Sequence, residues 1–134
     1  MKLELFQFEK LDYFIRFPDG YRDGEKYPVI VFLHGAGTRG DDIEILRNHV
    51  FFKEIAKHAD FPFIVVAPHC KKNMWYDVFE RLKRLVLYVA NSTFADKSRI
   101  YLMGASMGGF GSWQLAMSLP ELFAAVVPIC GGGL

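Results

Sequence analysis

The sequence predicts an α/β fold built on a mostly parallel sheet of about six strands. Short runs of β-branched, aliphatic and aromatic residues recur along the chain, and stretches with the apolar spacing of a helix separate them. Two segments near the N-terminus instead alternate apolar and polar residues, which is typical of antiparallel strands. Strands that alternate with helices favour parallel pairing, because a crossover helix returns the chain to the starting edge of the sheet.

The N-terminal segments are residues 2–8 and 11–17, and the residues between them are too few for a helix. We therefore expect an antiparallel hairpin there. Pro18 and Gly20 follow and favour a turn, since Pro fixes its own φ and Gly accepts a positive φ.

The later elements follow in the order strand, helix, strand, helix, strand, helix, strand, which indicates a doubly wound sheet. The continuous apolar runs have the composition of strands buried on both faces. The predicted strands are residues 28–33, 61–67, 99–103 and 124–129, and the predicted helices are residues 50–58, 78–91 and 107–119.

Length and composition restrict the class of protein. The 134 residues suit a single domain, residues 1–134, and 16 basic against 15 acidic residues leave a net charge of +1 without a basic cluster. We therefore expect no nucleic-acid partner. No apolar run approaches the ~18 residues of a membrane span, and the N-terminus does not have the pattern of a signal peptide. Cys70 and Cys130 lack metal-ligand spacing and are expected to be reduced thiols of a cytoplasmic protein.

A candidate nucleophile lies in the pentapeptide Gly104-Ala105-Ser106-Met107-Gly108. The predicted strand ends just before it and the predicted helix begins within it, which is the setting of a nucleophile elbow. In an elbow the serine adopts a strained backbone, and small residues on both sides avoid collisions. A tightly packed glycine turn is the alternative interpretation.

A second motif, His34-Gly35-Ala36-Gly37, follows the first buried strand. A turn at this place brings a backbone N–H beside the serine, and together with the N–H of Met107 it would form a two-donor oxyanion hole. A flexible glycine loop is the alternative, which the accompanying elbow disfavours. We expect His34 to order this loop rather than to act as a general base.

Three segments, residues 34–42, 65–70 and 96–109, carry a family resemblance. They resemble the esterase branch of the α/β-hydrolase superfamily, and more narrowly the phospholipase/carboxylesterase-like proteins near polyhydroxybutyrate depolymerases and feruloyl esterases. The resemblance implies that Ser106 is the nucleophile and that the amides of Ala36 and Met107 bind the oxyanion.

The resemblance also implies a set of pocket residues. Arg39, Gly40, Asp41 and Asp42 would form a loop beside the pocket. Trp75 would line the acyl or the alcohol side, with plain surface packing as the alternative for this residue. His69 would lie in the pocket wall.

The family pattern is incomplete in this sequence. A triad acid and then a histidine should follow the serine, yet the chain after Ser106 contains no Asp and no His, and its only acidic residue is Glu121. The histidines that precede Ser106 are weak substitutes as a base: His49 and His58 flank a predicted helix, and His69 ends a predicted strand. We therefore expect a hydrolase truncated after its sixth strand, with a split assembly and a pseudoenzyme as alternatives.

The sequence as a whole predicts a serine carboxylesterase that acts on small-molecule esters through an acyl-enzyme on Ser106, with no metal and no organic cofactor. A peptidase of the prolyl-oligopeptidase type shares the elbow and is the first alternative. The second is a non-catalytic module that associates with itself through the apolar strand 124–129. Self-association through this strand is expected in either case, because an uncovered apolar edge strand can pair with another chain.

Overall fold

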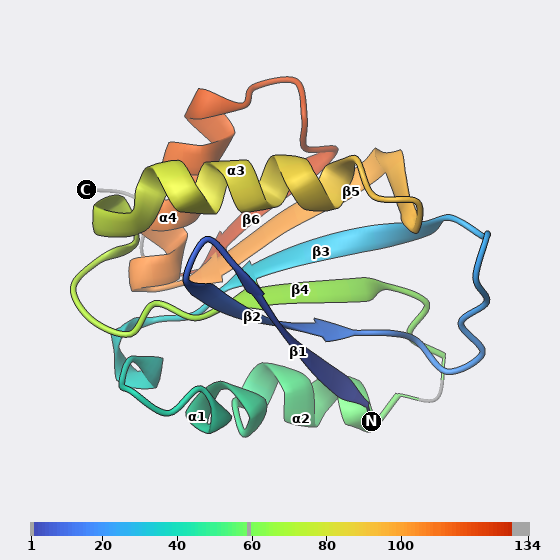
Figure 1. Ribbon diagram of the computed structural model, residues 1–134, viewed down its shortest axis with the longest axis horizontal. Helices are drawn as coiled ribbons and strands as arrows, with labels where there is room; N and C mark the ends of the chain where they lie inside the picture. The colour runs from blue at the N-terminus through green and yellow to red at the C-terminus, as the bar shows by residue number, and fades with distance from the viewer. Residues whose placement is uncertain (1, 59, 130–134) are drawn as a thin grey trace.

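Six strands form one mixed sheet in the computed structural model, which describes residues 2–58 and 60–129 (Figure 1). In spatial order they are β1 (Leu3–Phe8), β2 (Leu11–Arg16), β4 (Ile64–Pro68), β3 (Tyr27–Leu33), β5 (Ala95–Ala105) and β6 (Ala125–Ile129). β1, β2 and β4 pair antiparallel, whereas β4, β3, β5 and β6 pair parallel. The predicted fold class, including the N-terminal hairpin, is confirmed.

Helices cover both faces of this sheet. α1 (Glu44–Arg47) and α2 (Val50–Ala56) lie on one side, and α3 (Phe79–Ala90) and α4 (Met107–Ser118) lie on the other (Figure 1). Two short 3₁₀ helices, η1 (Ala36–Thr38) and η2 (Trp75–Val78), follow β3 and precede α3. η1 and α1 had no counterpart in the sequence prediction, because each is only about one turn long and carries no periodic pattern.

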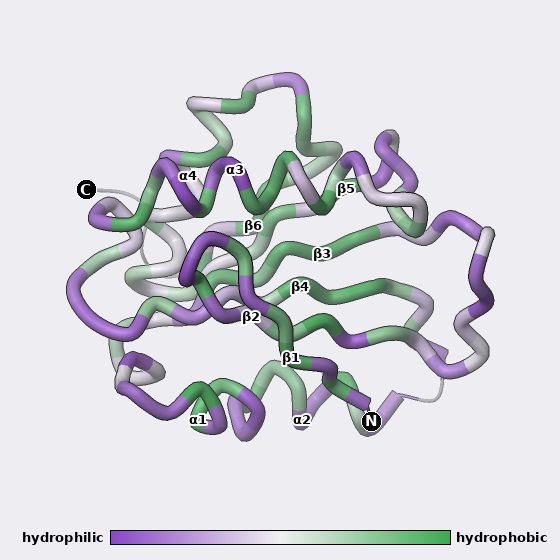
Figure 2. Tube along the Cα trace, in the orientation of Figure 1, coloured by the Kyte–Doolittle hydropathy of each residue, from purple (hydrophilic) through white to green (hydrophobic). Residues whose placement is uncertain are grey.

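The alternation of side chains along β3 divides the core into two layers. Val29, Val31 and Leu33 face α3 and α4, and Ile30 and Phe32 belong to the cluster around α2. Figure 2 shows the apolar stretches along β3 and β4 and the hydrophilic loops around them. A strand that packs on both faces must be apolar throughout, which explains the uninterrupted run in the sequence.

Two predicted strand boundaries were wrong. Residues 61–63 precede β4 without joining it, because the buried guanidinium of Arg16 donates to the carbonyl oxygens of Phe61 (2.6 Å) and Phe63 (2.9 Å). β5 instead begins four residues earlier than predicted, at Ala95, which pairs with Tyr27 across a register shift. Neither arrangement has a signal in local hydrophobicity.

β6 lies at the sheet edge and is not buried on both faces as its composition suggests. Val127 and Ile129 are each 43% exposed. The carbonyl of Ile129 accepts from the amide of Ser106, which directly follows β5. Backbone groups alternate in direction along a strand, so those of Pro128 face away from the sheet. Proline has no N–H to offer an added strand there. Self-association through this edge stays a prediction, and Cys130 lies outside the described residues.

None of the described helices is both long and apolar enough to cross a membrane. Among residues 2–58 and 60–129, no three His, Cys, Asp or Glu side chains gather as ligands of a metal ion would.

The first turn of α4 packs directly on the end of β3, and glycine makes this approach possible. A Cβ built on Gly108 would overlap the carbonyl oxygen of Leu33 and would lie 2.9 Å from the carbonyl oxygen of His34. Backbone atoms cannot move aside as a flexible side chain can. We expect Gly108→Ala to lower the free energy of unfolding by at least about 3 kcal/mol in a urea titration.

Gly37→Ala is the matched control for that substitution, because a Cβ at Gly37 meets no atom within 4 Å. Its unfolding free energy should stay within about 0.5 kcal/mol of the wild type. Equal stability of the two variants would contradict the packing described for Gly108.

Candidate active site

Ser106 lies between the end of β5 and the start of α4 in a backbone conformation that side chains rarely adopt. Its φ is +55° and its ψ is −114°. Such strain persists only where the surroundings enforce it. Here the Ser106 amide donates to the carbonyl of Ile129 at 2.8 Å, and the Ser106 carbonyl accepts from the amide of Gly109 at 2.8 Å. The serine side chain is exposed at this turn, with the geometry expected of a nucleophile elbow.

The turn after β3 lies against this elbow. A Cβ built on Gly35 would lie 3.5 Å from Cβ of Ser106 and 3.2 Å from the carbonyl oxygen of Ala105. Within the described part of the chain, the amides of Ala36 and Met107 have no hydrogen-bond acceptor. The structure thus brings together Ser106, the His34–Gly37 turn and the N-terminus of α4, as the two sequence motifs predicted.

His34 lies beneath this turn with both ring nitrogens engaged. Nδ1 donates to the carbonyl of Gly35 at 2.7 Å, since a carbonyl can only accept, and Nε2 accepts from the amide of Cys70 at 2.9 Å. Burial lowers the pKa of the His34 imidazole to about 4, despite the hydrogen bond to Gly35, which acts in the opposite direction. The ring is therefore neutral at pH 7, and it is arranged to support the loop rather than to accept a proton.

A second loop, residues 69–75, supports the turn from the side. His69 donates from Nε2 to the carbonyl of Thr38 at 3.0 Å, and the indole N–H of Trp75 donates to the carbonyl of His34 at 3.0 Å. Arg39 donates from its guanidinium to the carbonyls of Ala36 (3.1 Å) and Asn73 (2.9 Å). Three of these four hydrogen bonds end on backbone carbonyls of residues 34–38. No sequence motif predicts such bonds, because every residue has a backbone carbonyl.

The other residues predicted for the pocket differ in burial, and their roles stay predictions. His69 is 1% exposed, donates to the carbonyl of Thr38 and borders a second cavity of about 260 Å³ together with Cys70. Trp75 is also 1% exposed, which excludes surface packing. Arg39 and Asp41 are exposed on the loop after the turn, and neither lines the cavity next to Met107.

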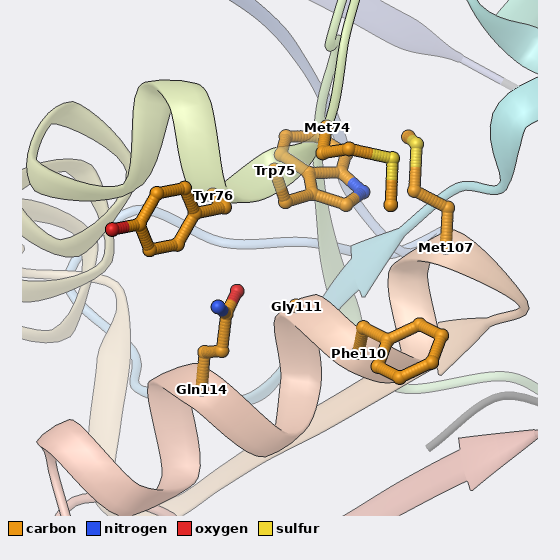
Figure 3. A pocket seen from close by; sticks show the side chains of 7 residues that line it. All are labelled: Met74, Trp75, Tyr76, Met107, Phe110, Gly111 and Gln114. Carbon is orange, nitrogen blue, oxygen red and sulfur yellow. The ribbon is translucent and has the colours of Figure 1, made fainter. Parts of the chain in front are cut away.

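That cavity lies between η2 and the face of α4 that begins beside Ser106. It has a volume of about 220 Å³, and Met74 and Met107 extend toward each other at one end (Figure 3). Gln114 supplies a polar group at the far end from Met107 (Figure 3). The residues that line it are Met74, Trp75, Tyr76, Met107, Phe110, Gly111 and Gln114.

Comparison with known proteins gives a consistent result. The model of a protein family described as "Putative esterase" matches residues 9–131. Esterase Rv1288 of Mycobacterium tuberculosis is 31% identical over 123 residues, which are 81% of this chain and 26% of that protein. Endo-1,4-beta-xylanase Y of Acetivibrio thermocellus is 27% identical over 136 residues, which are 85% of this chain and 12% of that protein.

Solved structures agree on the fold. A thermostable esterase superposes with a TM-score of 0.76 at 32% identity, over 99% of this chain and 41% of its own. A ferulic acid esterase superposes with a TM-score of 0.67 at 22% identity, over 93% of this chain and 58% of its own. The chain thus spans about a quarter of the Mycobacterium esterase and less than half of the thermostable esterase.

The family match covers both motifs and nearly all of the described sheet. It confirms the resemblance to esterases of the α/β-hydrolase type. The chain belongs to this esterase family.

Proposed function

We propose that this chain carries the nucleophile and the oxyanion-binding groups of a carboxylic ester hydrolase. The observation that supports this most directly is the close approach of the Gly35 turn to the strained, exposed Ser106, since a two-donor oxyanion hole requires such an approach. A packed glycine turn without function would have no need of a serine at positive φ.

The proposed reaction is acyl transfer to Ser106. Oγ forms a bond to the ester carbonyl carbon, and the π electrons move onto the carbonyl oxygen, which becomes an oxyanion. The amides of Ala36 and Met107 donate to it, assisted by the positive end of the α4 dipole. The oxyanion then re-forms the carbonyl as the carbon–oxygen bond to the alcohol breaks, and the alcohol leaves with the proton that Oγ gave up to a base. Water later hydrolyses the acyl-enzyme.

The cavity beside Met107 suggests where one side of the ester binds. Its walls are apolar apart from Gln114, and its volume of about 220 Å³ suits a short alkyl or aryl group rather than a peptide. Together with the esterase relatives, this lining favours esters over the peptide substrates of prolyl-oligopeptidases.

The proton of Ser106 needs a base, and the four histidines of the chain have other positions or partners. His34 is neutral and saturated with hydrogen bonds, and His69 is buried and bonded to Thr38. His49 caps α2 by accepting from the amide of Phe51, and His58 follows the same helix, on the opposite face of the sheet from α4. With these residues alone, turnover should be on the order of a million-fold below that of a complete triad.

The nucleophile can be tested with a fluorophosphonate probe. We expect slow but selective phosphonylation of Ser106 on long incubation, detected by peptide mass spectrometry, and none in Ser106→Ala. Without a base that titrates near neutrality, the logarithm of the labelling rate should rise linearly with pH rather than level off near pH 7.

Ser118→Ala, at the other end of α4, is the matched control and should label as the wild type does. Labelling spread over several serines, or unchanged in Ser106→Ala, would refute the assignment.

The role of His34 can be tested by its effect on acid stability. Its folded pKa of about 4 lies below the ordinary 6.5, so between these values the unfolded state binds more protons. Its contribution to stability is complete above about pH 6.5 and is lost as the pH falls toward 4. Urea titrations should show a loss of about 2 kcal/mol between pH 7.5 and pH 5 from this group.

In His34→Gln this part of the pH dependence should disappear, whereas His58→Gln, at an exposed position, should retain it. An identical pH dependence in all three proteins would show that His34 is not a buried neutral ring.

A further inference from the structure

We propose that Trp75 is a positioning residue for the oxyanion-binding amide of Ala36, acting through His34; this inference rests on the proposed function. The Ala36 N–H belongs to the peptide unit that also contains the carbonyl of Gly35. A trans peptide is planar and its C=O and N–H point in opposite directions, so whatever fixes the Gly35 carbonyl also aims the Ala36 N–H.

The Gly35 carbonyl is fixed by two donors. His34 Nδ1 lies 2.7 Å from it, and the amide of Thr38 donates to it at 3.2 Å. The Ala36 N–H then points away from the His34 ring, which lies buried below the turn, and is directed outward from the core.

His34 can donate from Nδ1 only if this nitrogen carries the proton of the neutral ring. The Cys70 amide sets this tautomer, because a backbone N–H that donates to Nε2 requires a lone pair there. The ring is enclosed further by His69 and Trp75, whose ring centroids lie 5.3 Å and 4.9 Å from its own. Both ring nitrogens of His34 therefore have hydrogen-bond partners within the protein.

Trp75 fixes the preceding peptide unit. Its indole N–H donates to the carbonyl of His34 at 3.0 Å. The peptide units on both sides of Gly35 are thus held through their carbonyls, that of His34 by Trp75 and that of Gly35 by His34. Trp75 is itself immobile, because it is 1% exposed and packs against α4, where a Cβ on Gly111 would lie 3.1 Å from the Trp75 side chain. The indole thus connects the helix that follows Ser106 to the turn that faces Ser106, and it sets the second oxyanion donor relative to the nucleophile.

The test compares the same substitution at the two tryptophans of the chain. Trp75→Phe removes the indole N–H and keeps an aromatic ring, whereas Trp113→Phe changes an exposed side chain on α4. Replacement of Trp75 by 3-benzothienylalanine serves as a second variant, since it removes the N–H at nearly constant volume and guards against misfolding of the phenylalanine variant.

Two readouts separate positioning from general packing. The first is the backbone amide proton shift of Ala36, which should move in both Trp75 variants and stay unchanged in Trp113→Phe. The second is phosphonylation of Ser106 at saturating probe, for which the maximal rate should fall about 10- to 100-fold. The ³¹P shift of the adduct should also move toward its value in the urea-unfolded protein.

The outcomes distinguish this inference from the proposed function. An unlabelled wild type would refute the nucleophile, and the Ala36 amide shift would still decide whether Trp75 orients the turn. Folded Trp75 variants with an unchanged Ala36 shift, or with the wild-type maximal labelling rate, would overturn the positioning role.

Discussion

The contact of two backbones, at the end of β3 and the start of α4, is the constraint on which the rest of the site depends. The carbonyl of Leu33 approaches Gly108 so closely that no side chain fits between them. This contact fixes where the chain leaves β3 and where it leaves Ser106. The turn that follows β3 therefore lies against the serine. Core packing at this contact, and not only the loop itself, determines where the turn lies.

Hydrogen bonds from side chains to carbonyl oxygens hold the exposed turn after β3 in one conformation. His34, Trp75 and Arg39 each donate to a carbonyl within residues 34–36. Carbonyls held in this way leave the N–H groups on the opposite side of each peptide directed outward. A turn supported only by glycine would sample many orientations, which is unfavourable for the oxyanion donor that we propose here.

Much of this architecture could be predicted from the sequence, and what was missed has a physical explanation. The apolar runs of β3 and β6 and the glycine spacing around Ser106 are local signals, and they identified the sheet and the elbow. The departure of residues 61–63 from the strand depends on Arg16, far away in the chain, and therefore escaped prediction. The support of His34 by the Cys70 amide has no sequence signal at all, because every residue except proline has the same backbone donor.

The parallel pairing of β3 with β5 also has a consequence for folding kinetics. Leu33 and Gly104 are partners across this pair although about seventy positions separate them in the chain. Closing so long a loop has an entropic cost, and non-local pairing of this kind slows folding in general. The elbow around Ser106 is local in sequence, whereas its contact with the Gly35 turn is long-range. The contact between the turn and Ser106 requires β3 and β5 to be paired, so a substitution that weakens this pairing also weakens the site.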